Sequence, residues 1–426
     1  MALDAKQQTV RKAVVAGTVG NIMEWYDFGV YGYFAPVIST LFFPTKNALT
    51  SLLLTFLVFG VGFVMRPVGA LIFGHYGDRA GRRNALAFTV ILMGVATFLI
   101  GVLPSYEKIG VLAPILLTLA RLAQGLSAGG EWGGSTSFIV EYANESKRGY
   151  IGSWQQFSTG AGLLLGSAMG ALLTNTMSKE ALYAWGWRVP FLVGLLIAVI
   201  GLYLRFGIEE TPKFKEVENA NEKAKAPLIE TLRTYPKEIL IALGFTVSWT
   251  VTYYVFLSFM PTYVSKVLKV PLSLSLISNT VGLLLFIALV PLMGALSDRI
   301  GRKPLLIASC LGFVVLTYPL FLVLGKSVFA LILLVQLIFA VLLAMFSGPG
   351  PAAIAELFPT KVRYSALSIG YNISVAGFGG TAPFISTYLI SATGNNLAPT
   401  YYVIAGALVS LLVIFGIRET YKEPLK

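Results

Sequence analysis

The sequence has few of the residues that catalyse reactions or hold metal ions. It contains one cysteine, Cys310, and one histidine, His75, among 426 residues. A lone thiol forms no disulfide within the chain, and one Cys with one His does not supply the ligands of a metal site. The sequence also lacks a GxSxG motif and a Walker P-loop. These absences argue against an enzyme and against ATP-driven transport, and they predict neither a metal nor another cofactor.

Charge is also scarce. Charged residues make up 12% of the chain and hydrophobic residues 56%, whereas a soluble domain averages about 25% charged residues. Much of the surface must therefore face something other than water, and we expect a lipid bilayer. The net charge of +12 does not indicate a nucleic-acid partner, because the basic residues lie between apolar runs and form no patch with interleaved aromatics.

The apolar runs have the length of membrane-spanning helices. A helix needs roughly 20 mostly apolar residues to cross a bilayer. The first run carries Glu24 and Asp27 and continues past Phe34, so it is too long and too interrupted for a cleavable signal peptide. We expect twelve spans, at residues 14–41, 49–73, 84–104, 111–142, 150–177, 187–208, 237–263, 271–296, 304–325, 328–355, 363–391 and 398–418. The predicted fold class is an all-α polytopic membrane protein.

Lys and Arg are unevenly distributed over the loops. With both termini placed in the cytoplasm, 23 of the 32 Lys and Arg residues fall on the cytoplasmic side and seven on the other side. The remaining two, Arg66 and Arg121, lie within spans. Because cytoplasmic loops carry an excess of Lys and Arg, we expect a multi-pass protein of the cell (inner) membrane with both termini in the cytoplasm.

The two halves of the chain carry the same loop motif. The segments Gly74–Arg83 and Gly294–Lys303 both fit GxxxDRxGR[RK], at an offset of 220 residues. The longest polar stretch, 209–236, separates these halves and is rich in Lys and Glu. We interpret it as a cytoplasmic linker between a six-helix bundle at 1–208 and a second bundle at 237–426, with a cavity near the midplane between them.

The repeated loops carry charges suited to a gate. In each half an acidic residue after the fourth span is followed seven residues later by Arg. We expect these groups to latch the cytoplasmic ends of the halves together, or to serve topology alone through the positive loops. The candidate gate residues are Gly74, Asp78, Arg79, Gly81, Arg82, Arg83, Asp298, Arg299, Gly301, Arg302, Glu141, Arg148, Glu356 and Arg363.

Several longer motifs resemble one transporter family. They are EWYDFGVY, RPVGALIFGHYGDRAGRR, RLAQGLSAGGEWGG, WGWRVPF and EETPKF, at Glu24–Tyr31, Arg66–Arg83, Arg121–Gly134, Trp185–Phe191 and Glu209–Phe214. With the doubled loop motif, they look like the metabolite–proton symporter family of the major facilitator superfamily. VTYY, RYSAL and YNISV, which start at Val251, Arg363 and Tyr371, look most like the proline/glycine-betaine osmolyte–proton symporters. The resemblance implies the twelve-helix major facilitator fold and proton symport.

Ionisable groups within the spans are confined to the first half. Glu24, Asp27, Arg66, Arg121 and Glu131 lie in spans 1, 2 and 4, while the interiors of spans 7–12 carry none. Such groups are costly in a membrane and mark function by default. We therefore expect Asp27, Glu131 and Glu24 to be candidates for proton coupling, with a fixed ion pair to Arg66 or Arg121 as the structural alternative.

Polar and aromatic side chains are the candidates for substrate binding. Aromatic faces suit a quaternary ammonium group, and an arginine suits a carboxylate. The tyrosines among them could instead pack in the core or lie in a lipid-interface belt. The candidates are Arg121, Tyr31, Gln155, Tyr253, Tyr254, Tyr371 and Asn372.

The sequence thus predicts a secondary transporter that works by alternating access, and not an enzyme. We expect symport of a proton with a small carboxylate-bearing metabolite, such as the zwitterions proline or betaine. The alternatives are symport of an organic acid such as 2-oxoglutarate, citrate or shikimate, an uncoupled facilitator, and a sensor built on a transporter fold. The expected partners are the substrate, the proton and the bilayer, with no nucleic acid, and the expected state is a monomer.

Overall fold

The computed structural model describes residues 18, 21–80, 82–129, 132, 136, 139–140, 143, 145–206, 235–358 and 360–423. Within these ranges the side chains of 74–80, 82–87, 145, 197, 201–206 and 360–366 are outside the description. The predicted linker 209–236 falls almost wholly outside the described residues, so the division at 208 and 237 stays a prediction.

Helices account for nearly all of the described first half. Residues 21–33 are helical. They are followed by α2 (Ala35–Phe42), α3 (Ala48–Val64), α4 (Arg66–Ala80), α5 (Arg82–Val102), α6 (Tyr106–Ile109), α7 (Leu112–Ala128), α9 (Arg148–Thr176), α10 (Lys179–Ala184) and α11 (Val189–Phe206).

The second half is helical in the same way, with three π-helical stretches. Its elements are α14 (Pro236–Tyr253), η3 (Tyr254–Phe259), α15 (Met260–Thr262), η4 (Tyr263–Val267), α16 (Leu272–Ile300), α17 (Arg302–Leu324), α18 (Phe329–Ser347), α19 (Gly350–Glu356), α20 (Thr360–Ser374), η5 (Val375–Gly379), α21 (Ala382–Thr393) and α22 (Ala398–Gly416). The π-helical stretches η3, η4 and η5 were not expected from the sequence, and such turns are frequent at functional sites.

The helices occupy the positions expected of twelve spans. Eight helical stretches of the described chain are long and apolar enough to cross a membrane, and three shorter apolar helices cover Phe88–Val102, Leu112–Ala128 and Gly186–Ile200. The first helical segment, residues 21–42, supplies the remaining position. The prediction of an all-α polytopic fold is confirmed.

Most prolines within the predicted spans lie where helices begin. Pro36, Pro261 and Pro383 occupy the first or second position of α2, α15 and α21, where a missing N–H costs little. Only Pro291 and Pro319 lie inside an uninterrupted helix of the described chain. The prolines therefore divide several spans into shorter helices.

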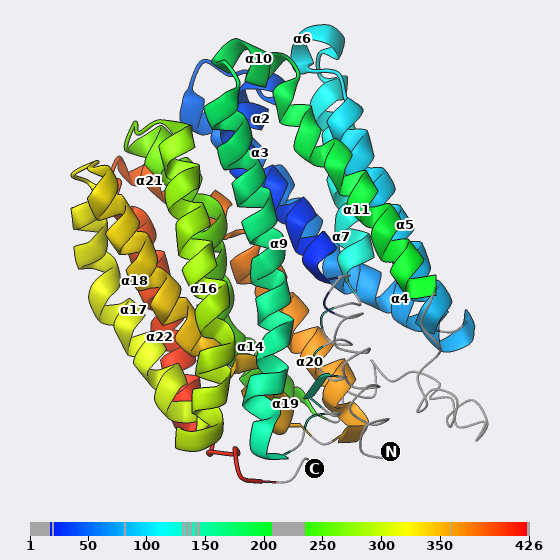
Figure 1. Cartoon of the computed structure of the whole chain (residues 1–426), viewed down its shortest axis with the longest axis vertical. Coiled ribbons are helices and arrows are strands. Elements are labelled where there is room, and N and C mark those ends of the chain that lie inside the picture. The colour runs from blue at the N-terminus through cyan, green and yellow to red at the C-terminus, as the bar shows by residue number, and fades with distance from the viewer. Residues whose placement is uncertain are drawn as a thin grey trace.

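The two halves meet along the helices α9 and α16, which run side by side through the centre of Figure 1. Helices α3 and α21 form a second contact between the halves. At the end where α9 begins, a Cβ atom on Gly149 would lie 2.5 Å from the carbonyl oxygen of Gly294, so glycine permits this close approach. Because α9 starts where α16 ends, one end of the bundle is closed by these two glycines.

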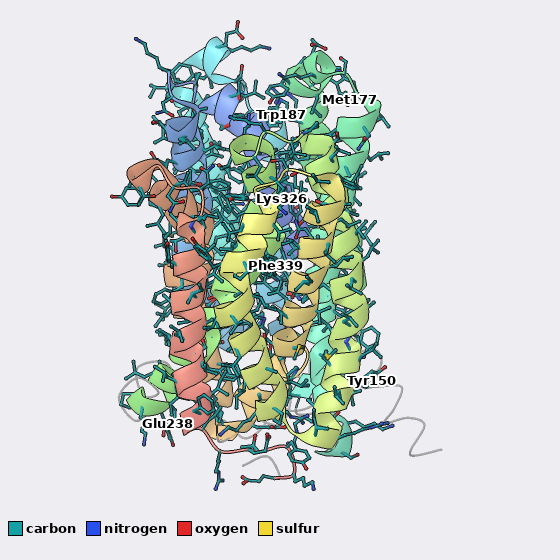
Figure 2. All side chains as sticks on the ribbon, turned by 90° about the vertical axis from the view of Figure 1, so that its left-hand side faces the viewer. Tyr150, Met177, Trp187, Glu238, Lys326 and Phe339 are labelled. Atoms are coloured by element: carbon teal, nitrogen blue, oxygen red, sulfur yellow. The ribbon has the colours of Figure 1, made fainter. Side chains whose placement is uncertain are left out.

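The two ends of the molecule can be told apart in Figure 2. Tyr150 and Glu238 lie at one end, Met177, Trp187 and Lys326 lie towards the other, and Phe339 lies midway. We call the end with Tyr150 the inner end, because the distribution of Lys and Arg predicts it to be cytoplasmic, and the opposite end the outer end. The assignment of these ends to the two sides of the membrane stays a prediction.

Candidate functional site

A ring of aromatic and polar side chains encloses a small cavity in the middle of the bundle. The side chains come from the first helical segment, α9, α14, η3 and α20, so both halves contribute. The cavity is lined by Trp25, Gln156, Thr159, Trp249, Thr250, Tyr253, Tyr254 and Tyr371, which we call the cage. It measures about 10 Å³, which is room for about one water molecule.

The rings of the cage pack against each other edge to face. The ring centroid of Trp25 lies 5.6 Å from that of Tyr253 and 5.8 Å from that of Tyr254. On the opposite wall, Tyr371 stacks on Trp132 with a centroid distance of 3.5 Å, and Trp249 lies 6.2 Å from Trp132. The cavity is therefore bounded by π faces and edges from both halves, an arrangement that suits a desolvated cation.

Several hydrogen-bonding groups of the cage have no partner in the described part of the chain. They are the indole Nε1 of Trp25, the hydroxyls of Tyr253 and Tyr254, and the amide Nε2 of Gln155, which lies beside the cage. The amide oxygen of Gln155 accepts a hydrogen bond of 2.6 Å from Gln156. A buried polar group without a partner costs about 1–3 kcal/mol. Four such groups around one cavity indicate a site that binds a polar ligand.

A second cluster lies inside the first half and contains Asp27. Its carboxylate accepts a hydrogen bond of 2.7 Å from Thr97 on α5, and Thr97 accepts one of 2.7 Å from Gln124 on α7. Arg121 in turn donates to the amide oxygen of Gln124, at 2.6 Å. Asp27 is 3% exposed, and it forms no ion pair in the part of the chain that the structure describes. A chain of three hydrogen bonds therefore links this buried carboxylate to the guanidinium group of Arg121.

Arg121 is surrounded by aromatic rings. Its guanidinium carbon lies 4.5 Å from the ring centroid of Tyr31, 4.8 Å from that of Phe28 and 5.2 Å from that of Phe59. The hydroxyl of Tyr31 donates to the carbonyl oxygen of Thr55, so the ring rather than the hydroxyl of Tyr31 contacts the arginine. These π faces offset part of the cost of burying the positive charge.

Glu24 pairs with a different arginine. Its carboxylate forms a buried ion pair with Arg66, although Glu24 lies only three residues before Asp27. The guanidinium group of Arg66 lies 5.8 Å from the ring of Trp25, a residue of the cage. Glu24 and Asp27 thus belong to separate clusters, one beside the cage and one deeper in the first half. The pairing of Glu24 with Arg66 matches the structural alternative stated for it.

The remaining predicted site residues are placed as follows. Tyr253, Tyr254 and Tyr371 line the cage, and Gln155 lies beside it. The side-chain amide of Asn372 donates to the carbonyl oxygen of Gly129 at 3.1 Å, which joins the two halves. Glu131 lies outside the described residues, so its role stays a prediction.

An ion-pair network closes the inner end. Glu356 accepts hydrogen bonds from Arg148 at 3.0 Å and from Arg302 at 3.1 Å, and all three side chains are buried. Asp298 accepts from the backbone N–H groups of Gly149 and Tyr150 at 2.8 and 2.9 Å, which caps the start of α9 across the interface. We call this set, with the tail residues described next, the inner latch.

The end of the chain adds to the inner latch. Thr420 donates to the carboxylate of Glu356 at 2.7 Å, and Arg148 donates to the carbonyl oxygen of Glu423 at 3.2 Å. Glu419 accepts from the backbone N–H of Lys303 at 2.9 Å, beside Gly301. Gly301 has φ +101°, which favours glycine at the turn between α16 and α17.

The other predicted gate residues either have exposed side chains or lie outside the part of the chain that the structure describes. Arg299 is exposed. The side chains of Asp78, Arg79, Arg82, Arg83 and Arg363 lie outside the described residues, as do Gly81 and Glu141 altogether, and the surroundings of Gly74 are not described.

The cage is closed on its outer side as well. On α9, Ser167 contacts Thr280 at 2.9 Å and accepts a hydrogen bond of 3.1 Å from Asn279, both on α16. The rings of Phe56 and Phe259, one from each half, meet at a centroid distance of 5.6 Å. Because cage residues 156 and 159 lie between Gly149 and Ser167 along α9, the halves touch on both sides of the cavity. The structure is therefore an occluded state.

Sequence reasoning missed part of the site. Trp25 and Trp249 were not singled out, because a tryptophan in an apolar run usually indicates packing. Thr97 and Gln124 were also missed, although a polar side chain within an apolar run was the available signal. Thr420 lies in the tail, where no sequence pattern indicated a contact with the gate.

Comparison with known proteins agrees with this architecture. The family described as "Sugar (and other) transporter" matches residues 12–234 and 215–426. The glycine betaine/proline/ectoine/pipecolic acid transporter OusA of Dickeya dadantii is 39% identical, over 98% of this chain and 85% of the relative. The proline/betaine transporter of Escherichia coli K12 is 37% identical over the same shares.

Solved structures share the fold. The proton:xylose symporter XylE, a major facilitator superfamily protein, superposes with a TM-score of 0.80 at 18% identity, over 99% of this chain and 98% of that chain. A D-xylose–proton symporter gives 0.77 at 20% identity, over 98% and 100%. The chain therefore belongs to the sugar (and other) transporter family, has the twelve-helix major facilitator fold and is a membrane transporter, not an enzyme.

Proposed function

We propose that the chain is a proton-coupled symporter of a small zwitterionic osmolyte, such as betaine or proline, in the cell (inner) membrane with both termini in the cytoplasm. The single observation that carries the proposal is the cage, which combines aromatic faces with unpaired hydrogen-bond donors at the centre of the bundle. The names of the relatives from Dickeya dadantii and Escherichia coli support the substrate class.

The two kinds of group in the cage suit the two poles of a zwitterion. Trp25, Trp249 and Tyr371 offer ring faces and edges to a quaternary or secondary ammonium group. The hydroxyls of Tyr253 and Tyr254 have no hydrogen-bond partner within the described residues. A substrate carboxylate can accept a hydrogen bond from each of them. The cavity must widen to admit such a molecule, so binding couples to movement of one half against the other.

The composition of the cage disfavours an organic acid with several charges. No charged side chain is among the described residues that line the cavity, and two or three carboxylates without a cation would be costly there. Arg121 belongs to the Asp27 cluster instead. We therefore favour a role for Arg121 in organising the proton-binding carboxylate over a direct contact with the substrate.

Asp27 is the carboxylate best suited to carry the proton. Asp27 is buried, which disfavours its charged form, and it has no ion pair within the described residues to offset that cost. Arg121 acts on it through space and is joined to it by the hydrogen bonds of Thr97 and Gln124. Protonation would remove a buried charge from the space between α5, α7 and α11 and so change how these helices pack. Glu24 lies three residues before Asp27 on the same helix and pairs with Arg66 beside the cage, so a movement of this helix on protonation would reach the substrate site.

Transport in proteoliposomes with an imposed proton gradient tests the proposal. Betaine or proline should accumulate, and a protonophore should abolish the accumulation, whereas 2-oxoglutarate and citrate should not accumulate. Uptake that is insensitive to the protonophore would instead favour an uncoupled facilitator, and binding without uptake would favour a sensor.

The variant Asp27→Asn tests the coupling residue. We expect it to lose gradient-driven accumulation but to keep exchange of labelled for unlabelled substrate, because exchange needs no net proton movement. The variants Glu24→Gln and Glu131→Gln, measured in the same way, show whether another carboxylate carries the proton. Accumulation by Asp27→Asn at the wild-type level would refute this assignment.

A further inference from the structure

A second cavity lies at the outer end between the two halves and is separate from the cage. Its volume is about 250 Å³. The first half contributes the end of α2, the connection to α3 and the start of α3, and the second half contributes one lysine from η4. The cavity is lined by Ser39, Thr40, Pro44, Thr45, Lys46, Ala48, Ser51, Leu52 and Lys266.

The cavity is positively charged and has no counter-charge of its own. Lys46 and Lys266 come from opposite halves, and neither ammonium group has a hydrogen bond or an ion pair within the described residues. No acidic residue is among the described residues that line the cavity. Lys179 and Lys269 lie near enough to Lys266 to add like charge. Lys266 therefore lies among like charges, with Lys46 on the same cavity wall, and this surplus of positive charge favours an anion in the cavity.

Other groups around the cavity also suit an anion. Helix α3 begins at Ala48, a lining residue, and its start is capped by Asn47, whose side-chain oxygen accepts a hydrogen bond of 2.9 Å from the N–H of Leu49. Thr40, Thr45 and Ser51 place hydroxyl groups on its wall. Those of Thr40 and Thr45 donate to the carbonyl oxygens of Pro36 and Asn47, and the Ser51 hydroxyl lies 2.9 Å from that of Thr45. An oxyanion would therefore bind chiefly to the two ammonium groups, with the Ser51 hydroxyl as a further donor.

We propose that this outer cavity is a binding site for one oxyanion group, either a carboxylate or a phosphate, held between Lys46 and Lys266. Because the two lysines belong to opposite halves, the bound anion draws the outer ends of the halves together and stabilises the state with the outer side closed. The site goes beyond the proposed transport function and does not depend on it. The anion can be the carboxylate of a zwitterion, a free phosphate or the phosphate of a lipid headgroup.

Lysine modification measured by mass spectrometry tests this site directly. Purified protein is acetylated with an amine-reactive reagent in the presence of inorganic phosphate, of glycine betaine, or of lipid vesicles with and without phosphatidylglycerol, each at the same ionic strength set with chloride. An exposed ion pair is worth about 0.2–1 kcal/mol, so we expect acetylation of Lys46 and Lys266 to slow about 1.4-fold to fivefold with at least one probe. The probe that protects identifies the source of the anion.

Two other lysines of the outer end serve as matched controls. Lys108 and Lys326 are exposed and do not line the cavity; Figure 2 shows Lys326 at the end of α17. Their acetylation should not change with any probe. In the variant Lys46→Gln, protection of Lys266 should fall towards the control level.

The proposal is overturned if no probe protects Lys46 and Lys266 beyond chloride, or if the controls are protected equally. It is also overturned if Lys46→Gln leaves the protection of Lys266 unchanged. The experiments with phosphate and with lipid vesicles do not require betaine to be a substrate. Their results can therefore be interpreted even if the protein does not transport betaine.

Discussion

Removing one hydroxyl from the cage, in the variant Tyr254→Phe, should change substrate affinity and stability in opposite directions. The hydroxyl of Tyr254 is buried and has no hydrogen-bond partner within the described residues. In the ligand-free protein this unpaired hydroxyl therefore lowers the free energy of unfolding by about 1–3 kcal/mol. With a zwitterion bound, the same hydroxyl donates to a carboxylate, and a hydrogen bond to a charged group is worth about 1.5–3 kcal/mol.

The expected dissociation constant for betaine or proline rises about tenfold to a hundredfold, because 1.4 kcal/mol corresponds to a factor of ten. The midpoint of thermal unfolding of the ligand-free protein should stay the same or increase. Substrate binding to the purified protein and thermal unfolding in detergent measure the two quantities on one preparation.

The variant Tyr263→Phe is the matched control. The hydroxyl of Tyr263 donates to the carbonyl oxygen of Asn396 at 3.0 Å, away from the cage. Its removal should lower the unfolding midpoint, since a satisfied bond worth about 1 kcal/mol is lost, and should leave affinity unchanged. An unchanged affinity in Tyr254→Phe, or a stability loss equal to that of Tyr263→Phe, would refute the assignment of this hydroxyl to the substrate.

Three further changes probe the cage and the inner latch. Glu356→Gln removes the carboxylate that Arg148 and Arg302 share, while Arg302 keeps its ion pair with Asp298. Because breaking a buried pair costs about 3–5 kcal/mol, cysteines introduced at the inner end should become more accessible to thiol reagents. Thr420→Ala should have a smaller effect of about 1 kcal/mol. Gly149→Val places side-chain atoms against the backbone of Gly294 and should shift the protein away from the inner-closed state, measured by the same labelling; unchanged labelling would contradict this contact. Trp25→Ala removes a ring face and should weaken betaine binding by about 0.5–2 kcal/mol, measured by calorimetry, and equal affinity would argue against the cage.

The sole cysteine makes the labelling experiments practical. Cys310 is buried, so cysteines introduced at the inner end report their own accessibility against a low background. The assay therefore needs no prior removal of native thiols.

The spans could be predicted from the sequence because the bilayer imposes a local rule. A spanning helix needs a fixed length of apolar residues, whatever its neighbours are. The repeated loop motifs were equally readable, and two of their residues, Asp298 and Arg302, lie in the inner latch. The π-helical stretches η3, η4 and η5 were not predictable, because they arise where packing inserts a residue into a helix rather than from composition.

The partners of the buried carboxylates could not be predicted from the sequence. Glu24 and Asp27 were both expected to be candidates for proton coupling, and residues three apart are neighbours on a helix. The structure gives them different partners, Arg66 for Glu24 and Thr97 for Asp27. The partners lie on other helices, and helical periodicity does not fix the rotation or depth at which two helices meet.

The sequence by itself determined the membrane class, the number of spans, the repeat and the confinement of intramembrane charge to the first half, because each follows from residue type and spacing along one chain. Only the tertiary structure decided which side chains form the cage, which arginine each carboxylate meets and how the tail joins the inner latch. Those contacts join residues of different helices that are distant in the sequence, such as Trp25 with Tyr253 and Arg148 with Glu356. They depend on how helices from two halves pack, and that packing is set by all the facing side chains together.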